Sequence, residues 1–433
     1  MGNTGLVWFR NNLRTQDNVC LQKAIQQNEK VIAVYFFDPR YFETDVFGFK
    51  KTEKYRAKFL LETVAALREN LERLHIPLFI YQQHPEDVMP QFFEGRNISN
   101  VYTQKEWTKE ETAITNAVKN AVERYEVTWH EDFDQFLFHP DDIPFALHNI
   151  PQVFTNFRKK CEKYVTVRPK IEIKPLPESN RIENPTELPI LRTLGFEDYT
   201  EDSRTAFPFS GGEDKALHRI ETYFWDTKKL SYYKKTRNGL VGRDYSSKLS
   251  AWLANGSISA RTVYHEIKKY EQQVTKNEST YWLIFELIWR DFFKYIALKH
   301  QNDIFKIGGI LHKEYQWSTD EALIKQWING ETSEPFVNAN MLEIKYTGWM
   351  SNRGRQNVAS FFAKEQQLDW RIGAAYFESM LLDYDVHSNY GNWLYVAGVG
   401  NDPRDRKFNI KTQAERYDPK QNYQNLWLQS KLF

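Results

Sequence analysis

The sequence predicts an α/β N-terminal domain with a doubly wound parallel sheet, followed by an all-α C-terminal domain. Over residues 1–135, short apolar runs alternate with amphipathic helical patterns, which is typical of a parallel α/β sheet. From about residue 211 onward, prolines are rare and apolar residues recur at helical spacing. The length of 433 residues also exceeds what one hydrophobic core usually serves.

The N-terminal domain is expected to consist of short strands joined by long helices. The expected strands cover residues 6–9, 31–37, 78–81, 101–103 and 127–130, and helical periodicity covers residues 54–74 and 109–124. Residues 9–14 read FRNNLR rather than G-x-G-x-x-G, so a dinucleotide site of the Rossmann type is not expected after the first strand.

A proline-rich stretch separates the two domains. Residues 169–208 hold six of the sixteen prolines, which marks an extended connector. Residues 211–433 hold only Pro335, Pro403 and Pro419. We therefore divide the chain into an α/β domain over residues 1–135, a connector over 136–210 and a helical domain over 211–433.

Composition limits the expected binding partners and the expected cellular compartment. The net charge of +1 gives no general affinity for polyanions, so any nucleic-acid contact requires a local basic groove. Cys20 and Cys161 are far apart, which argues against a disulfide framework or a metal site and favours the cytoplasm. Met1 is followed almost at once by a strand, which leaves no room for a signal peptide, and no apolar run reaches membrane-spanning length. We expect a monomer that binds no membrane.

Residues 281–293 form the most informative helix, because it is apolar on all sides yet contains two charges. Glu286, Trp289 and Arg290 share one face at spacings of three and four residues. An unpaired buried charge would cost several kcal/mol, so this face is either an internal ion pair or the wall of a polar pocket. Judged on the helix alone, the ion pair is favoured.

Three further clusters carry polar chemistry in the helical domain. Residues 233–250 place hydroxyls, a lysine and a helix start together, as a diphosphate requires, although Ser250 could be a simple N-cap. Residues 347–357 place Asn352 and Gln356 four apart, with arginines between them that could equally be solvated. Residues 382–395 combine two acids, which could merely cap a turn, with asparagines and aromatic rings.

Together the clusters resemble the photolyase and cryptochrome family, and most closely its DASH branch. The resemblance spans nearly the whole chain. It rests on VWFR at 7–10, FDPR at 37–40, TRNGL at 236–240, DYSSK at 244–248, NRGRQN at 352–357, DYD at 383–385, SNYGNW at 388–393 and GVGNDPR at 398–404.

The resemblance implies FAD buried in the helical domain. Asp383 and Arg355 would pair beside the isoalloxazine, Asp385 would accept from its N3–H region, and Asn389 would face N5. The other implied cofactor-binding residues are Arg290, Tyr233, Ser246, Ser247, Lys248, Leu249 and Ser250. An asparagine side chain can hydrogen-bond N5 without changing charge, as in photolyases, whereas an aspartate would favour a protonated N5.

The same resemblance implies a pocket for a cyclobutane pyrimidine dimer in DNA. The implied lining residues are Glu286, Trp289, Asn352, Gln356 and Tyr395. Gln356 and Tyr395 replace the methionine and the second stacking tryptophan of ordinary dimer photolyases. This more polar platform should hold an extruded dimer less well, so single-stranded DNA, where no base pairs must be opened, is the expected substrate. Repair of (6-4) lesions, which uses a histidine pair, is not expected.

The resemblance also implies residues for electron transfer and for a light-harvesting antenna. Trp393, Trp370 and Trp317 match the family's relay from flavin to surface, although each could be ordinary core. Glu106 matches the acid that contacts a 5,10-methenyltetrahydrofolate antenna in relatives, although a solvated acid before a helix would explain it as well.

Two classes of function remain open. One is repair of dimers by light-driven electron donation from reduced FAD, which we favour, and the other is a blue-light photoreceptor that signals through the flavin redox state. A receptor normally has a long C-terminal tail, whereas this chain ends at Phe433 soon after its last motif, residues 417–419. A passive binder of single strands would not explain Asp383, Asp385 and Asn389.

Overall fold

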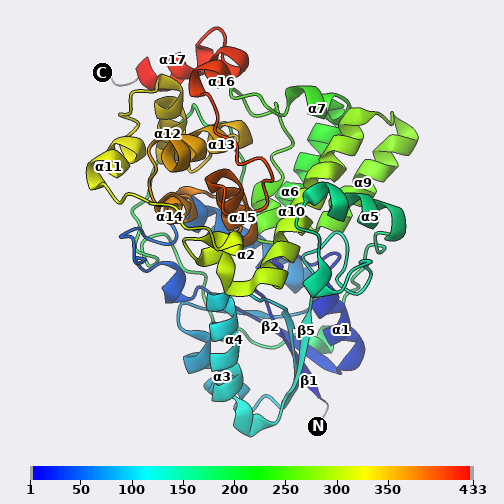
Figure 1. The fold of residues 1–433 in the computed structure, drawn as a ribbon. Helices are drawn as coiled ribbons and strands as arrows, with labels where there is room; N and C mark the ends of the chain where they lie inside the picture. The colour runs from blue at the N-terminus through cyan, green and yellow to red at the C-terminus, as the bar shows by residue number, and fades with distance from the viewer. Residues whose placement is uncertain (1–2, 430–433) are drawn as a thin grey trace.

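The computed structural model describes residues 3–429 and shows a parallel sheet at one end of the molecule and helices at the other (Figure 1). The sheet has the strand order β3-β2-β1-β4-β5, with all neighbours parallel. The strands are β1 (Thr4–Trp8), β2 (Lys30–Phe36), β3 (Leu78–Tyr81), β4 (Ile98–Gln104) and β5 (Thr128–Asp132). The predicted doubly wound sheet is confirmed, with strand ends that differ by a few residues.

Helices cover both faces of this sheet. Successive apolar side chains of each strand point to opposite faces, so both faces need a covering layer. Val7 of β1 packs into one core with residues of α1 and α2, whereas Leu6 and Trp8 pack into the opposite core with residues of α3 and α4. The helices are α1 (Val19–Gln27), α2 (Lys54–Arg73), α3 (Pro85–Phe93) and α4 (Lys109–Ala121). Both expected helices of this domain are therefore present, as α2 and α4.

Residues 213–429 are mostly helical, as expected for residues 211–433, whereas residues 165–212 contain no α-helix or strand. Helix α5 (Phe154–Tyr164) lies earlier, within the expected connector, and buries Phe157 and Cys161 in the helical core. The other α-helices are α6 (Glu213–Ile220), α7 (Tyr233–Thr236), α8 (Ser250–Ala254), α9 (Ala260–Gln273), α10 (Glu278–His300), α11 (Glu321–Asn329), α12 (Pro335–Thr347), α13 (Asn352–Ser360), α14 (Trp370–Met380), α15 (Val386–Ala397), α16 (Ile410–Tyr417) and α17 (Asn422–Leu428). Short π-helical turns continue α6 over Glu221–Asp226 and α13 over Phe361–Glu365.

Helix α2 belongs to both halves of the molecule. Its first turns place Tyr55 and Phe59 in the core of the helical domain, while Leu61, Val64 and Leu67 belong to the core of the sheet. One continuous helix therefore fixes the two domains relative to each other.

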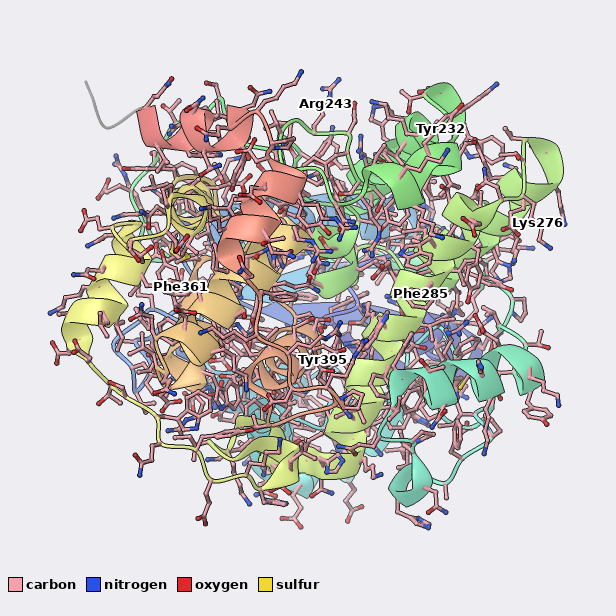
Figure 2. All side chains as sticks on the ribbon, turned by 45° about the horizontal axis from the view of Figure 1, so that its top comes forward. Tyr232, Arg243, Lys276, Phe285, Phe361 and Tyr395 are labelled. Carbon is pink, nitrogen blue, oxygen red and sulfur yellow. The ribbon has the colours of Figure 1, made fainter. Side chains whose placement is uncertain are left out.

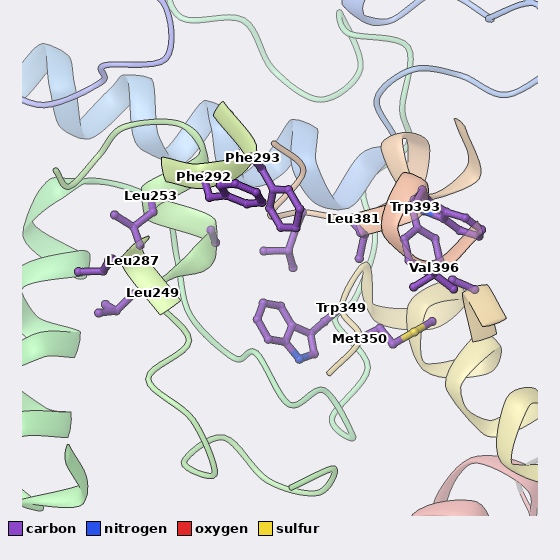
Figure 3. Packing of buried hydrophobic residues seen from close by; sticks show 14 of the residues in the cluster. Leu249, Leu253, Leu287, Phe292, Phe293, Trp349, Met350, Leu381, Trp393 and Val396 are labelled. Atoms are coloured by element: carbon purple, nitrogen blue, oxygen red, sulfur yellow. The ribbon is translucent and has the colours of Figure 1, made fainter. Parts of the chain in front are cut away.

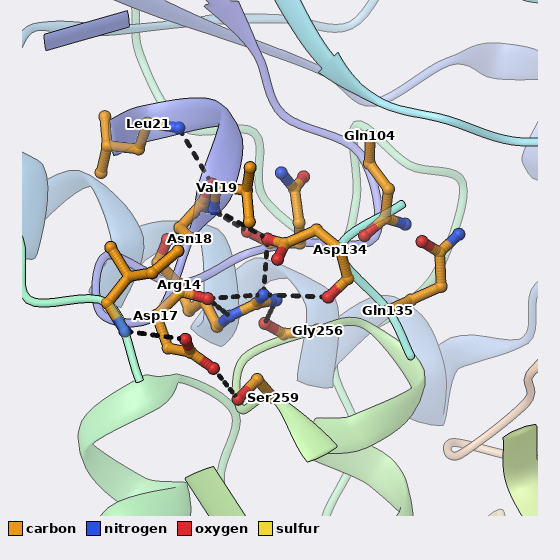
Figure 4. Close-up of polar contacts among 12 residues, drawn as sticks. Arg14, Asp17, Asn18, Val19, Leu21, Gln104, Asp134, Gln135, Gly256 and Ser259 are labelled. Atoms are coloured by element: carbon orange, nitrogen blue, oxygen red, sulfur yellow. Dashed lines mark hydrogen bonds and ion pairs between the residues drawn. The ribbon is translucent and has the colours of Figure 1, made fainter. Parts of the chain in front are cut away.

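A buried charge cluster makes a second connection between the domains, and Figure 4 shows its members Arg14, Asp17 and Asp134. Arg14 donates to Asp134 at 2.6 Å and to the carbonyl of Gly256 at 3.1 Å. Arg261 at the start of α9 donates to Asp134 at 2.8 Å and to Asp17 at 3.0 Å. All four charged side chains are at most 3% exposed. Because removing one member would leave a buried charge unpaired, loss of any of them should destabilise the fold by about 3–5 kcal/mol.

Candidate flavin and DNA-repair site

Glu286 on α10 forms the ion pair that the sequence favoured, but with a different partner. Its Oε1 lies 2.8 Å from Nη1 of Arg237 and accepts from Nε1 of Trp282 at 3.1 Å. Burial raises the pKa of Glu286, and the charge of Arg237 opposes that rise. Because 30% of the Glu286 side chain remains exposed, this carboxyl group is both paired and accessible at a surface.

Arg290, the charge one turn further along α10, points to the domain interface instead. It donates to the carbonyl of Gln135 at 2.5 Å and to the carbonyl of Leu253 at 2.9 Å. Burial lowers its pKa, which Asp385 and Asp291 oppose. Glu286 and Arg290 therefore do not pair with each other, because each of them contacts a partner on a different segment.

Trp289 and Tyr395 lie together, as the resemblance implies for a common pocket. Their rings are perpendicular, with centroids 6.0 Å apart, and Trp289 stacks on Phe154 at 3.7 Å. The hydroxyl of Tyr395 accepts from Arg406 at 3.0 Å. In Figure 2, Tyr395 lies on the face turned toward the viewer, with Phe285 of α10 on the same face.

Several of the other candidate residues line one small cavity of about 80 Å³ between α13, α14 and α15. The candidates that line it are Asn352, Arg355, Gln356, Asp383, Asp385, Asn389 and Trp393. Ser351 caps α13 and fixes its first turn, and Asp385 caps α15 by accepting from the backbone of Ser388. Figure 3 shows buried residues of this region, among them Leu249, Trp349 and Trp393, which come from separate segments.

The expected pairing of Asp383 with Arg355 is present. Nη2 of Arg355 lies 2.8 Å and 3.0 Å from the two carboxylate oxygens of Asp383, and Nε donates to the carbonyl of Met350. The Asp383 side chain is only 2% exposed. This pair fixes α13 against the loop before α15.

Asn389 has a defined amide orientation. Its Nδ2 donates to the carbonyl of Ala374 at 3.0 Å, and a carbonyl can only accept. Oδ1 is therefore the polar atom that remains for a ligand in the cavity that Asn389 lines. Asn389 presents a neutral acceptor to that ligand.

Asp385 belongs to a buried triad that the sequence analysis missed. Nζ of Lys294 donates to Asp385 at 2.9 Å and to Nδ1 of His387 at 3.0 Å. Burial alone would raise the pKa of Asp385, but Lys294 and His387 hold it well below its usual range. Burial and the charge of Lys294 lower the pKa of His387 to about 4, so this ring is neutral at physiological pH.

The loop before α8 places Lys248 in an unusual setting. Its ammonium group is buried without a hydrogen-bond partner, 3.4 Å from the ring centroid of Tyr245 and 4.6 Å from that of Trp349. Burial lowers its pKa well below the usual value. Its backbone is left-handed, with φ of 63°, a conformation that strains a non-glycine residue and often marks a functional site. A buried cation with free donors fits a phosphate group.

Arg219 holds this loop in shape and was also missed. It donates to the carbonyls of Ser246 at 3.1 Å and Ser247 at 3.0 Å, and it pairs with Asp244 at 2.9 Å. Ser250 is the first residue of α8 and is exposed, and the residue at the N-cap position is Leu249. The simple N-cap that could have explained Ser250 is therefore not present. Tyr233 is buried at the start of α7.

The three tryptophans that are expected to form the relay lie on neighbouring segments. The ring of Trp393 on α15 packs against Gly373 of α14, so closely that a Cβ at Gly373 would lie 2.2 Å from the ring. Gly373 is one helical turn after Trp370 on the same helix. Next to Trp317, the backbone of Ser318 hydrogen-bonds Gln367 at 2.8 Å and Asp369 at 2.9 Å. Trp370 and Trp393 are both buried, at 0% and 2% exposure, whereas Trp317 is partly exposed.

A second, larger cavity of about 640 Å³ lies between the α/β and helical domains and is lined by Glu106. Glu106 accepts from Gln104 at 2.8 Å, and burial raises its pKa to about 7, against the charge of Arg10. His387 and Gln135 also line this cavity, and each has a buried polar atom without a partner. Asp385 lines both cavities, so the two sites share one carboxylate.

Comparison with known proteins assigns the fold to a family. The family model for DNA photolyase matches residues 5–180, and the model for the FAD binding domain of DNA photolyase matches residues 282–431. The chain belongs to the photolyase and cryptochrome family. Its cofactor is FAD, and its relatives belong to the DASH branch.

The relatives cover nearly the whole chain. A cryptochrome DASH of Gloeobacter violaceus is 46% identical over 98% of this chain and 85% of its own length. The cryptochrome DASH of Xenopus laevis is 46% identical over 97% and 81%. A solved cryptochrome of Synechocystis has a TM-score of 0.94 at 43% identity, over 99% of this chain and 89% of that one. Within residues 3–429, no helix is long and apolar enough to cross a membrane.

Proposed function

We propose that this protein repairs cyclobutane pyrimidine dimers under blue light, preferentially in single-stranded DNA, in the cytoplasm and as a monomer. Reduced FAD, once excited, would supply the electron that splits the dimer. The observation that carries the proposal is the accessible carboxyl group of Glu286, held by Arg237 and Trp282 beside an aromatic platform.

The flavin would be held by charges that are already fixed in place. The Asp383–Arg355 pair and the triad of Asp385, Lys294 and His387 would surround its ring system. The ammonium of Lys248 would receive the diphosphate, because a charge-assisted hydrogen bond there satisfies a buried donor. Oδ1 of Asn389 would accept from a protonated N5, which supports binding of the reduced cofactor.

The lesion would lie against Trp289 and Tyr395, with Glu286, Asn352 and Gln356 at its polar edges. Glu286 would exchange hydrogen bonds with the thymine carbonyl and imide groups as negative charge develops on them. Tyr395 is tied to Arg406, so one side of the platform is polar and offers less stacking area than a tryptophan. Such a platform supports a preference for single strands, in which extrusion of the lesion requires no unpairing.

The interdomain cavity would hold the antenna, for which we propose 5,10-methenyltetrahydrofolate. Unpartnered Nε2 of His387, Oε1 of Gln104 and Oε1 of Gln135 supply a donor and two acceptors suited to the edge of a pterin ring. Glu106 adds a carboxyl group whose pKa, raised to about 7 by burial, lets it donate or accept near neutrality.

One assay tests the proposal directly. The purified yellow protein, reduced and illuminated, is mixed with dimer-containing oligonucleotides in single-stranded and duplex form, and dimer loss is measured. We expect light-dependent loss that is faster in the single strand, with a dark sample as control. Flavin that photoreduces normally while dimers persist in both substrates would instead favour the photoreceptor function.

A further inference from the structure

The outer end of the tryptophan relay contacts a tyrosine for which no role has been assigned. The ring of Tyr315 lies 5.6 Å from that of Trp317, at an interplanar angle of 80°. Tyr315 is 38% exposed, whereas Trp317 is partly buried. A redox-active ring at this position would be the last one before solvent.

The hydroxyl of Tyr315 has a carboxylate as its acceptor. It donates to Oδ2 of Asp405 at 3.1 Å and accepts from Nζ of Lys313 at 3.2 Å. Asp405 is also paired with Lys364. Burial raises the pKa of Asp405, but Lys364, Tyr315 and Lys313 together hold it below the usual range. The carboxylate is therefore ionised at neutral pH and can accept a proton.

A glycine at the end of α15 leaves room for the side chains around Tyr315. A Cβ at Gly398, the cap of α15, would lie 1.9 Å from Oδ1 of Asp405 and 2.5 Å from Nζ of Lys364. Nζ of Lys313 also donates to the carbonyl of Gly398 at 2.9 Å. The helix that carries Trp393 thus ends against the cluster around Tyr315.

The surrounding charges decide how Tyr315 could be oxidised. Nζ of Lys364 lies 5.1 Å and Nζ of Lys313 lies 5.6 Å from the ring centroid. Two cations this close to the ring oppose a third positive charge on it. Loss of an electron alone is therefore disfavoured, whereas loss of an electron together with the phenolic proton leaves the ring neutral.

We propose that Tyr315 is the terminal electron donor of the relay and that Asp405 is its proton acceptor. The oxidant is the radical cation of Trp317, which forms when the relay passes an electron inward. Trp317 takes one electron from Tyr315, the phenolic O–H bond breaks, and the proton bonds to Oδ2 of Asp405. The products are neutral Trp317, a neutral tyrosyl radical and a carboxylic acid. This inference rests on the relay of the proposed function.

A neutral radical at the surface has a functional consequence. The electron cannot return to Tyr315 unless the proton also returns from Asp405, so the charge separation should last longer than with a tryptophan radical alone. An external reductant can then reach the exposed ring.

The test uses Tyr315→Phe in the flavin-loaded, oxidised protein, with Tyr164→Phe as a control at an exposed tyrosine of α5. Transient absorption after a light pulse should show a tyrosyl radical in the unmodified protein and in the control. In Tyr315→Phe we expect only tryptophan radical, which decays several-fold faster, and a lower yield of photoreduction. Ring-deuterated tyrosine should narrow the radical's electron paramagnetic resonance signal in the unmodified protein.

Two further variants separate the possible failures. Asp405→Asn keeps an acceptor oxygen but cannot take the proton, so it should also lose the tyrosyl signal. Trp393→Phe should abolish photoreduction altogether. If it does, while Tyr315→Phe keeps the radical yield and lifetime of the unmodified protein, the role of Tyr315 is refuted and the relay stands. If Trp393→Phe photoreduces normally, the relay itself is refuted and this inference with it.

Discussion

Replacing Lys248 by methionine should stabilise the flavin-depleted protein and yet weaken flavin binding. The Lys248 ammonium is buried without a hydrogen-bond partner. Leaving such a group unsatisfied costs about 1–3 kcal/mol, which methionine of similar length would restore to the flavin-depleted fold. A charge-assisted hydrogen bond to a phosphate contributes about 1.5–3 kcal/mol, so its loss should weaken FAD binding by about 10- to 150-fold.

The pH dependence of stability offers an independent check. Because burial lowers the pKa of Lys248 below its usual 10.5, the unfolded chain binds more protons at this site than the folded flavin-depleted chain does. The free energy of unfolding should therefore rise with pH over the window between the lowered pKa and 10.5. This contribution should disappear in Lys248→Met.

Two assays measure these effects. Urea unfolding gives the stability of the flavin-depleted protein, and titration of that protein with FAD, monitored by fluorescence quenching, gives the binding affinity. Lys235→Met, at an exposed lysine of α7, is the matched control and should change neither quantity. The assignment of Lys248 to the diphosphate is refuted if the variant binds FAD as tightly as the unmodified protein. A loss of stability in the flavin-depleted variant would refute the claim that its ammonium is buried unsatisfied.

Three other variants test the rest of the site. Asp383→Ala leaves the Arg355 guanidinium without the carboxylate that accepts from its Nη2, so the purified protein should be pale, and full flavin absorbance would remove this pair from the cofactor site. Glu286→Ala should lower repair yield per photon while photoreduction survives, and unchanged repair would leave Glu286 as no more than the structural partner of Arg237. Trp393→Phe should lose photoreduction by an external thiol, whereas the chemically reduced variant should still repair single strands; loss of both would mean that Trp393 is structural.

Local patterns in the sequence were sufficient for the strands and for two helices of the α/β domain, but they did not identify α1, α3 or α5. The strands and helices α2 and α4 follow from alternation and helical periodicity, which depend on neighbouring residues only. The same spacing identified Glu286 and Arg290, and it continues to Lys294, one turn further along α10. Extending that pattern by four residues would have pointed to the triad with Asp385 and His387.

Partners from distant segments could not be predicted in this way. Glu286 pairs with Arg237 of the loop after α7, and Arg219 of α6 holds the loop that ends at Lys248. Which residues meet across the domain is decided by helix packing, and a single sequence contains no direct record of that. Gly373 and Gly398 gave no signal either, since a glycine reveals its role only when the side chain opposite it is known.

The charge cluster of Arg14, Asp17, Asp134 and Arg261, together with the shared helix α2, should make the two domains unfold as one cooperative unit. A ligand that binds only the folded state stabilises every part of such a unit. Amide hydrogens of β1, inside the sheet, should therefore exchange with solvent more slowly when flavin is bound in the helical domain. The α/β domain would then report on the occupancy of a site that it does not itself form.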